Sequence, residues 1–254
     1  DMTITGAIDT YYHDIAGIAG VATPGKDLTQ IISDCSFSGS LTDSRGYGYM
    51  AGIVSKALNA NITRCANTAS ISGLRANPDN DVYAAGIVAW CNESTIDNCL
   101  NSGTIVKTGS TQGNGGIVGY ISIGYAIMET PPRPVNLSTV RNCYNSGQVI
   151  TSYTAPRKGI WGYTFFKDEV PDPLKGQITN CYNDYQATGL RFADFDKATS
   201  ELTSGSLPAG FAADAWQLEA GRYPVLKSMP ANVAALASAN LLLAQGETVN
   251  KVKK

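Results

Sequence analysis

The feature that most constrains this chain of 254 residues is an internal repeat marked by five cysteines. Each of them has an aliphatic residue three positions earlier, and the last four have an asparagine two positions later. They are spaced 30, 34, 44 and 38 residues apart and are Cys35, Cys65, Cys99, Cys143 and Cys181. A recurring unit of this length indicates an array of similar supersecondary units, each stacked on the next.

A second block, glycine followed by isoleucine, alternates with the cysteines. Its five copies begin at Gly17, Gly52, Gly86, Gly116 and Gly159. Both series advance together, so one unit contains both. Met2 occupies the cysteine position of an earlier unit, with Gly6 four residues later, so the chain begins within a repeat and holds about six units in whole or part.

Each unit consists of short β-favouring stretches separated by Ser, Thr, Asn, Asp and Gly, as turns require. A unit of this kind cannot bury its own apolar face, whereas stacked units bury a continuous core. The sequence therefore predicts an all-β protein, a parallel β-helix or β-solenoid of about six coils over residues 1–188. Adjacent coils should lie about 4.8 Å apart.

In this geometry the repeated residues become inward-facing ladders. We expect the five cysteines to be small buried thiols, because parallel Cβ vectors disfavour disulfides and the spacings do not resemble zinc sites. The asparagines should bond at turns and from coil to coil. The glycines should mark sharp corners or close backbone approach. Cys91 falls outside the pattern, and no cofactor or metal is expected.

At these residues the chain resembles the GLUG-repeat proteins, whose name describes a Gly-aliphatic-any-Gly block. Gly17 to Gly20, Gly116 to Gly119 and Gly159 to Gly162 match the block, while the copies ending in Ser55 and Ala89 depart from it. The segments 98–103 and 142–147 resemble the family's linking segment. The resemblance covers residues 1–190 and implies a secreted or surface-attached bacterial protein, such as an adhesin-like protein or a large IgA-cleaving metallopeptidase.

The segment after the repeats resembles the ending of such arrays, with Trp216 followed by Tyr223, Pro224 and Leu226. An open solenoid end exposes strand edges and needs a cover. We predict a C-terminal cap over residues 189–228, built on Phe192, Phe195, Leu207, Phe211, Trp216 and Tyr223. Residues 229–254 are then a linker, an interdomain helix or the start of a following module. Other domains of the same polypeptide are expected partners.

Composition excludes several functions. The chain has 19 Lys and Arg against 21 Asp and Glu, which argues against nucleic acid or anionic lipid as a partner. No apolar run reaches about 18 residues, so no membrane span is expected. His13 is the only histidine, which excludes multi-histidine metal sites. Acidic residues do not recur at fixed repeat positions and familiar catalytic motifs do not occur, so no catalytic residue is expected.

Insertions indicate where a ligand could bind. The distance from the glycine block to the next cysteine is 13 residues in two units but 18, 27 and 22 in the others, so the additions concentrate at one corner of the coil. Insertions on one face often form the binding face of a solenoid. The candidate ligand-binding residues are Tyr125, Glu129, Arg133, Phe166, Asp168 and Glu169. Decoration without a ligand, or a calcium site at Asp168, Glu169 and Asp172, are the alternatives.

The sequence thus favours a non-enzymatic, extracellular structural or adhesion module of a bacterial surface or secreted protein, with a host protein or a glycan as its ligand. An accessory repeat domain of a large secreted peptidase or glycan-active enzyme is one alternative. A carbohydrate-active β-helix enzyme is the other, since parallel β-helices host such enzymes.

Overall fold

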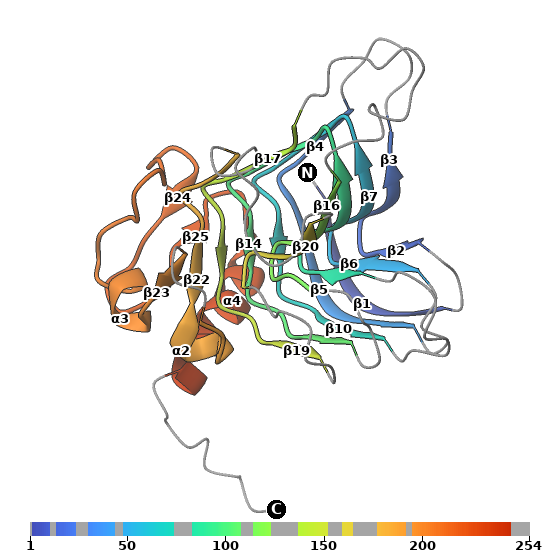
Figure 1. The fold of residues 1–254 in the computed structure, drawn as a ribbon. Helices are drawn as coiled ribbons and strands as arrows, with labels where there is room; N and C mark the ends of the chain where they lie inside the picture. Colours follow the sequence, from blue (N-terminus) through green and yellow to red (C-terminus); the bar gives the residue numbers. More distant parts are fainter. Residues whose placement is uncertain are drawn as a thin grey trace, which may run out of the picture.

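Parallel strands stacked coil upon coil form the body of the molecule (Figure 1). The computed structural model describes residues 2–10, 14–23, 30–43, 48–73, 83–107, 114–122, 137–151, 159–164, 177–191 and 195–244. Within these residues the chain is a β-solenoid, which confirms the predicted fold class. The coil count differs slightly from the expected six, because two of the sheets contain five described strands each.

The coils pass through sheets that we call A, B, C and D, and sheet B is formed by three of the coils. Sheet B contains β2 (Asp14–Ala16), β6 (Tyr49–Ala51) and β11 (Ala84–Ala85). Sheet C contains β3 (Ala19–Ala22), β7 (Val54–Leu58), β12 (Val88–Asn92), β16 (Val118–Ser122) and β20 (Trp161–Thr164). Sheet D contains β4 (Gln30–Ser33), β8 (Ala60–Thr63), β13 (Thr95–Asp97), β17 (Thr139–Arg141) and β21 (Ile178–Thr179).

Sheet A is the longest stack. Its strands are β1 (Met2–Thr10), β5 (Cys35–Asp43), β9 (Ala66–Asn67), β10 (Ser70–Gly73), β14 (Leu100–Asn101), β15 (Ile105–Lys107), β18 (Tyr144–Asn145), β19 (Val149–Thr151), β22 (Tyr182–Asp184) and β23 (Asp196–Lys197). β1 pairs with β5 along its whole length, with Met2 opposite Cys35. This pairing confirms that Met2 occupies the cysteine position of the first coil.

The repeat places equivalent residues in exact alignment from coil to coil. In sheet D an aliphatic row faces the core, and its members are Ile32, Ile62, Ile96, Val140 and Ile178. In sheet C, Val54, Val88, Val118 and Trp161 form a second inward row. Burial of each large aliphatic side chain contributes about 1.5–3 kcal/mol, so these rows supply much of the stability.

The corner between sheets D and A depends on a left-handed residue directly before each cysteine. Asp34, Arg64, Asn98, Asn142 and Asn180 all have φ between 50° and 56°. Asn and Asp tolerate this conformation, whereas Arg64 adopts it at a cost of about 1–2 kcal/mol. The turn residue is therefore the one before the cysteine, and the asparagine two positions after it has another role.

The glycine block forms the corner between sheets B and C, where neighbouring coils approach closely. A Cβ atom built on Gly52 or Gly86 would lie 2.4 Å from the carbonyl oxygen of the next coil's glycine. On Gly116 the corresponding distance would be 2.1 Å. No side chain fits at this spacing, so the predicted close backbone approach is confirmed.

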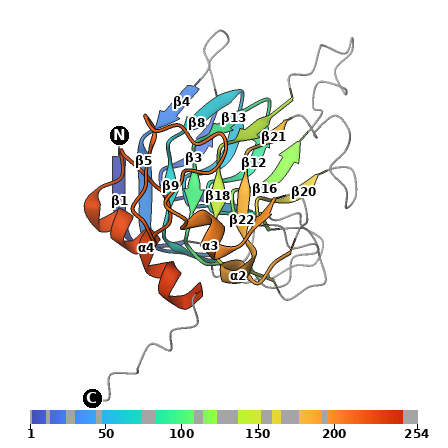
Figure 2. The same ribbon diagram turned by 90° about the vertical axis from the view of Figure 1, so that its left-hand side faces the viewer.

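The C-terminal segment first covers the end of the solenoid and then its flank. β23 pairs with β22 and extends sheet A, and Phe195 packs edge-on against Trp161 with ring centroids 5.1 Å apart. α2 (Tyr185–Thr188) lies between β22 and β23. After β23 the chain continues through α3 (Thr199–Leu202), the antiparallel pair β24 (Trp216–Gln217) and β25 (Val225–Leu226), and α4 (Ala231–Ala244). Figure 2 shows this segment crossing in front of the strands of sheet A.

The flank contact is a second apolar core, separate from the solenoid interior. Outward-facing residues of sheet A, among them Leu100 and Tyr144, pack against Trp216 and Tyr223 of the C-terminal segment and Val233 of α4. Of the residues predicted to form a cap, Leu207, Phe211, Trp216 and Tyr223 belong to this flank, Phe195 covers the end, and Phe192 lies outside the described residues. No described helix has the length and apolarity needed to cross a bilayer.

Candidate binding surface

A buried ladder of amides runs through the solenoid beneath sheet A. Asn67 Nδ2 donates to Asn101 Oδ1 at 2.7 Å, Asn101 Nδ2 to Asn145 Oδ1 at 2.7 Å, and Asn145 Nδ2 to Asn183 Oδ1 at 3.3 Å. Each of the first three amides also donates to the backbone carbonyl two residues later. The ladder ends where Asn183 Nδ2 meets Asp196 Oδ1 of β23 at 3.1 Å. These asparagines are therefore structural residues.

The repeated cysteines are buried, and all six cysteines of the chain are free thiols. Their Sγ atoms donate to carbonyl oxygens, as Cys143 does to Arg141 at 3.0 Å and Cys65 to Thr63 at 3.3 Å. Cys91 lies in an inward row of sheet C between Ala57 and Ile121, a position that the cysteine spacing does not reveal. Burial raises the pKa of Cys91 to about 12 and that of Cys143 well above its usual range. Such thiols are poor nucleophiles and poor metal ligands.

Carboxylates of the solenoid are engaged in structural contacts. Asp34 accepts two hydrogen bonds from Arg64, both at 2.6 Å, and this bond holds the pKa of Asp34 below its usual value. Asp97 pairs with Arg141 at 3.0 Å. Asp184 accepts from two backbone N–H groups at the start of α2. Within the described part of the chain, no group of three or more His, Cys, Asp or Glu side chains is placed to hold a metal ion.

An aromatic hollow lies on the outer side of sheets B and C, and we call it the aromatic groove. Tyr49, Lys56, Leu58 and Trp90 line a hollow of about 280 Å³. Tyr83, which is buried, stacks on Tyr49 with ring centroids 5.6 Å apart and planes 4° apart.

Tyr120 extends this stack by one more coil. Its ring lies 4.7 Å from that of Tyr83, centroid to centroid, with an angle of 17° between the planes. Small residues make room for the rings: Ala51 and Ala89 are buried beside Tyr83, and a Cβ on Gly119 would lie 3.0 Å from the Tyr83 Cβ. Tyr83 is buried at 3% exposure, so it holds the partly exposed rings of Tyr49 and Tyr120 in place from between them.

The strand pairing explains why these residues share one face. Lys56, Trp90 and Tyr120 lie opposite one another in β7, β12 and β16, each four residues after the glycine that begins its block. Tyr49 and Tyr83 each lie three residues before that glycine. The repeat thus carries a signal for this surface, but the residue type at the fourth position varies between Val21, Lys56, Trp90 and Tyr120, so the alignment of cysteines and glycines does not reveal it.

The groove carries one ion pair at its rim. The Lys56 ammonium lies 3.1 Å from Asp14 Oδ2 and 4.6 Å from the centroid of the Tyr49 ring. Both charged side chains are partly exposed, at 30% and 25%. The two charges cancel, while the ammonium and carboxylate supply polar hydrogen-bonding groups next to the aromatic walls.

The ligand-binding residues predicted from the insertions, Tyr125, Glu129, Arg133, Phe166, Asp168 and Glu169, lie outside the described residues, as does the calcium alternative that includes Asp172. The insertions do connect β16 to β17 and β20 to β21. Both insertions therefore begin at the carboxyl end of a strand of sheet C. The same sheet carries Lys56, Trp90 and Tyr120.

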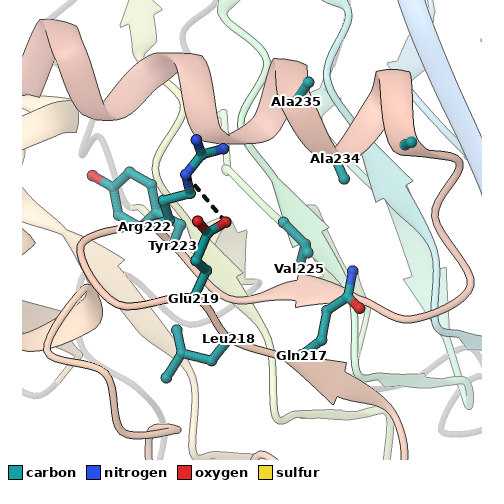
Figure 3. Close-up of a pocket in the computed structure, with 9 residues that line it drawn as sticks. Gln217, Leu218, Glu219, Arg222, Tyr223, Val225, Ala234 and Ala235 are labelled. Atoms are coloured by element: carbon teal, nitrogen blue, oxygen red, sulfur yellow. Dashed lines mark ion pairs between the residues drawn. The ribbon is translucent and has the colours of Figure 1, made fainter.

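A second hollow, of about 360 Å³, lies between sheet E (β24 and β25) and α4 (Figure 3). Ala234 and Ala235 of the helix form one wall, and Val225 and Gln217 lie on the strand side. The Glu219 and Arg222 side chains pair across it at 3.3 Å, and both are more than half exposed. This hollow follows from the small alanine side chains of α4 and has one aromatic lining residue, Tyr223.

Comparison with protein-family models, with curated proteins and with solved structures found no match for this chain.

Proposed function

We propose that this chain is a non-enzymatic structural and adhesion module of a bacterial surface or secreted protein, and that it acts outside the cell by binding a glycan or a host protein. Its resemblance to GLUG-repeat proteins and its solenoid architecture both favour this role. A stack of coils gives an elongated scaffold with a long lateral surface, which suits contact with extended ligands.

The observation that carries the proposal is a difference between the inward-facing and the outward-facing residues of the coil. The repeated polar or reactive side chains, such as those of Asn101 and Cys99, are buried in the solenoid, where they form ladders from coil to coil. The outward position four residues after each glycine instead carries different side chains, among them Trp90 and Tyr120. Aromatic side chains beside a few polar groups are typical of binding surfaces.

The proposal is tested by pairing binding with turnover. The purified chain is applied to glycan arrays and to arrays of host extracellular proteins. It is also incubated with polysaccharides while new reducing ends and unsaturated sugar products are measured. Saturable binding without products is the expected result. Release of products at a rate above the blank would overturn the non-enzymatic assignment in favour of a carbohydrate-active β-helix.

The location is tested separately in the bacterium that encodes the chain. Antibodies against the purified chain should label intact cells or detect it in the culture medium. Labelling that requires permeabilised cells would contradict the extracellular assignment. This experiment does not depend on which ligand the module binds.

A further inference from the structure

We propose that the aromatic groove is a binding site for a neutral glycan, with one sugar residue seated in the hollow between Tyr49 and Trp90. This inference rests on the proposed function and names its ligand class. Lys56 and Leu58 complete the lining, and the buried Tyr83 supports Tyr49 from behind.

The size of the hollow favours a small unit over a protein surface. Its volume of about 280 Å³ is near the lower end of small-ligand sites, which span about 300–1,000 Å³. A stable protein interface buries about 800 Å² on each partner, far more than the four described lining residues provide. A sugar residue at the end of a chain, or within it, fits this scale.

The chemistry of the lining suits a sugar. A hexose has an apolar face of C–H groups and a rim of hydroxyls, and it binds where aromatic surface adjoins hydrogen-bonding groups. Tyr49, Leu58 and Trp90 provide the apolar walls. Lys56 provides donors at the rim, since the ammonium has three N–H groups and its described bond to Asp14 uses one of them.

The charge of the groove favours a neutral ligand. Among the described residues that line the hollow, Lys56 is the only cation, and Asp14 neutralises it at 3.1 Å. A site for an acidic glycan would instead offer unpaired cations. Binding should therefore depend little on ionic strength, because no net charge is neutralised on association.

The groove is also preformed. Tyr49, Tyr83 and Tyr120 are stacked across three coils whose spacing is fixed by backbone hydrogen bonds, such as Met50 N to Tyr83 O at 2.9 Å. A rigid wall loses little conformational entropy when a ligand binds. Lys56, Trp90 and Tyr120 lie opposite one another along the solenoid axis, which allows a longer glycan to continue over the neighbouring coils.

The groove contains its own spectroscopic reporter. The chain has three tryptophans, of which Trp161 and Trp216 are each 1% exposed, whereas Trp90 is half-buried at the surface. A sugar seated against Trp90 should change the intrinsic fluorescence. The test titrates the chain with hexasaccharides of β-1,4-linked glucose, xylose and mannose, and with an oligogalacturonate as the acidic comparison, by fluorescence and by calorimetry.

For at least one neutral hexasaccharide we expect saturable binding that is stronger than for the oligogalacturonate. Trp90→Ala should weaken it about tenfold or more, as loss of a central aromatic contact does. Trp90→Phe should retain most of the affinity and lose the fluorescence change, and Lys56→Met should weaken binding several-fold. Tyr185→Ala is the matched control, because Tyr185 is a half-buried tyrosine of α2 away from the groove. Circular dichroism and thermal unfolding establish that each variant is folded.

The contrary outcomes are distinct. Glycan binding that is unchanged in folded Trp90→Ala and Lys56→Met would overturn the groove assignment and leave the proposed function standing. Binding of host proteins with no binding of the hexasaccharides would overturn the glycan inference alone. Preference for the oligogalacturonate, with strong salt dependence, would overturn the neutral-ligand argument. Cleavage of a hexasaccharide would instead overturn the proposed function itself.

Discussion

Tyr223 donates its hydroxyl to Oδ2 of Asp184 at 2.5 Å, which joins the C-terminal segment to the last full strand of sheet A. Asp184 is fully buried, and its other oxygen accepts from the first turn of α2. Burial and the neighbouring carboxylate raise the pKa of Tyr223, so the phenol remains protonated and keeps donating. One carboxylate thus holds the end cap and the flank segment together.

Removing this hydroxyl should destabilise the protein. Tyr223→Phe keeps the ring but leaves one oxygen of a buried carboxylate without its donor, at a cost of about 1.5–3 kcal/mol. Urea unfolding followed by circular dichroism measures the change. Tyr182→Phe is the control, since the Tyr182 hydroxyl donates to Ala209 O in an exposed position. Equal unfolding midpoints for the two variants would contradict the role given to Asp184.

Breaking the amide ladder should cost more. Asn101→Ala removes the acceptor of Asn67 Nδ2 and the donor to Asn145 Oδ1, together with the partners of the Gly103 N–H and C=O. Four buried groups therefore lose a hydrogen bond, at about 1–3 kcal/mol for each one left unpaired. Asn61→Ala, at a half-buried site on β8, should change stability by less than about 0.5 kcal/mol. The free energies of unfolding of both variants provide the measurement. A small effect of Asn101→Ala would show that water or a shifted neighbour replaces the amide.

A methyl group at the corner between sheets B and C should prevent coil stacking. In Gly86→Ala the new Cβ would lie 2.4 Å from the Gly116 carbonyl oxygen, against backbone that is fixed on both sides. We expect loss of soluble protein, or destabilisation of more than about 3 kcal/mol. Gly221→Ala is the matched control: it has φ of +79° but nothing within 4 Å of the added atom, so only the backbone cost of about 1 kcal/mol applies. Similar behaviour of the two variants would refute the close approach.

The Asp34–Arg64 pair should give a pH-dependent contribution to stability. Because Arg64 lowers the pKa of folded Asp34, the contribution is present above the unfolded pKa of about 4 and is lost as the pH falls through the folded pKa. Arg64 is 41% exposed, so the pair contributes no more than about 1 kcal/mol. The difference between the parent and Arg64→Met in urea unfolding should be present at pH 7 and shrink in strong acid. Met keeps a side chain at the left-handed position, so the backbone cost is matched.

The thiols should be inert in the folded protein. All six are free and buried, so a reagent cannot reach them while the coils remain stacked. A thiol reagent at pH 8 should therefore modify almost none of them in the native state and all six in denaturant. Fewer than six in denaturant without reductant would indicate a disulfide that the solenoid geometry does not contain. Rapid native labelling would indicate that the coils open locally.

Much of the solenoid could be predicted because its repeat contains aliphatic residues at fixed positions, and such residues are normally buried. The spacing of Ile62, Ile96 and Val140 predicts an inward row, and these residues are opposite one another in sheet D. The left-handed corner could not be distinguished in the same way, since Asn98 and Asn101 both flank Cys99 and both types suit turns. Only the backbone shows that Asn98 turns and Asn101 forms the ladder.

The flank segment and the groove required the structure for different reasons. Trp216 donates to Asn98 Oδ1 at 2.7 Å across 118 residues, a contact that no local pattern specifies. The groove combines Tyr49 of sheet B with Trp90 of sheet C, and only the angle between the two sheets brings their rings to one hollow. Their repeat positions are regular, but the residue types are not, so periodicity alone does not mark them.

The path of the C-terminal segment has a mechanical consequence. It runs back across the coils and is attached at Asn98, Tyr144 and Asp184, three points on three different turns of the solenoid. When tension is applied between the two ends of the molecule, these attachments bear load in parallel with the strand pairing. The turns beneath the segment would then separate only after it detaches, so the segment should raise the force at which the solenoid unfolds.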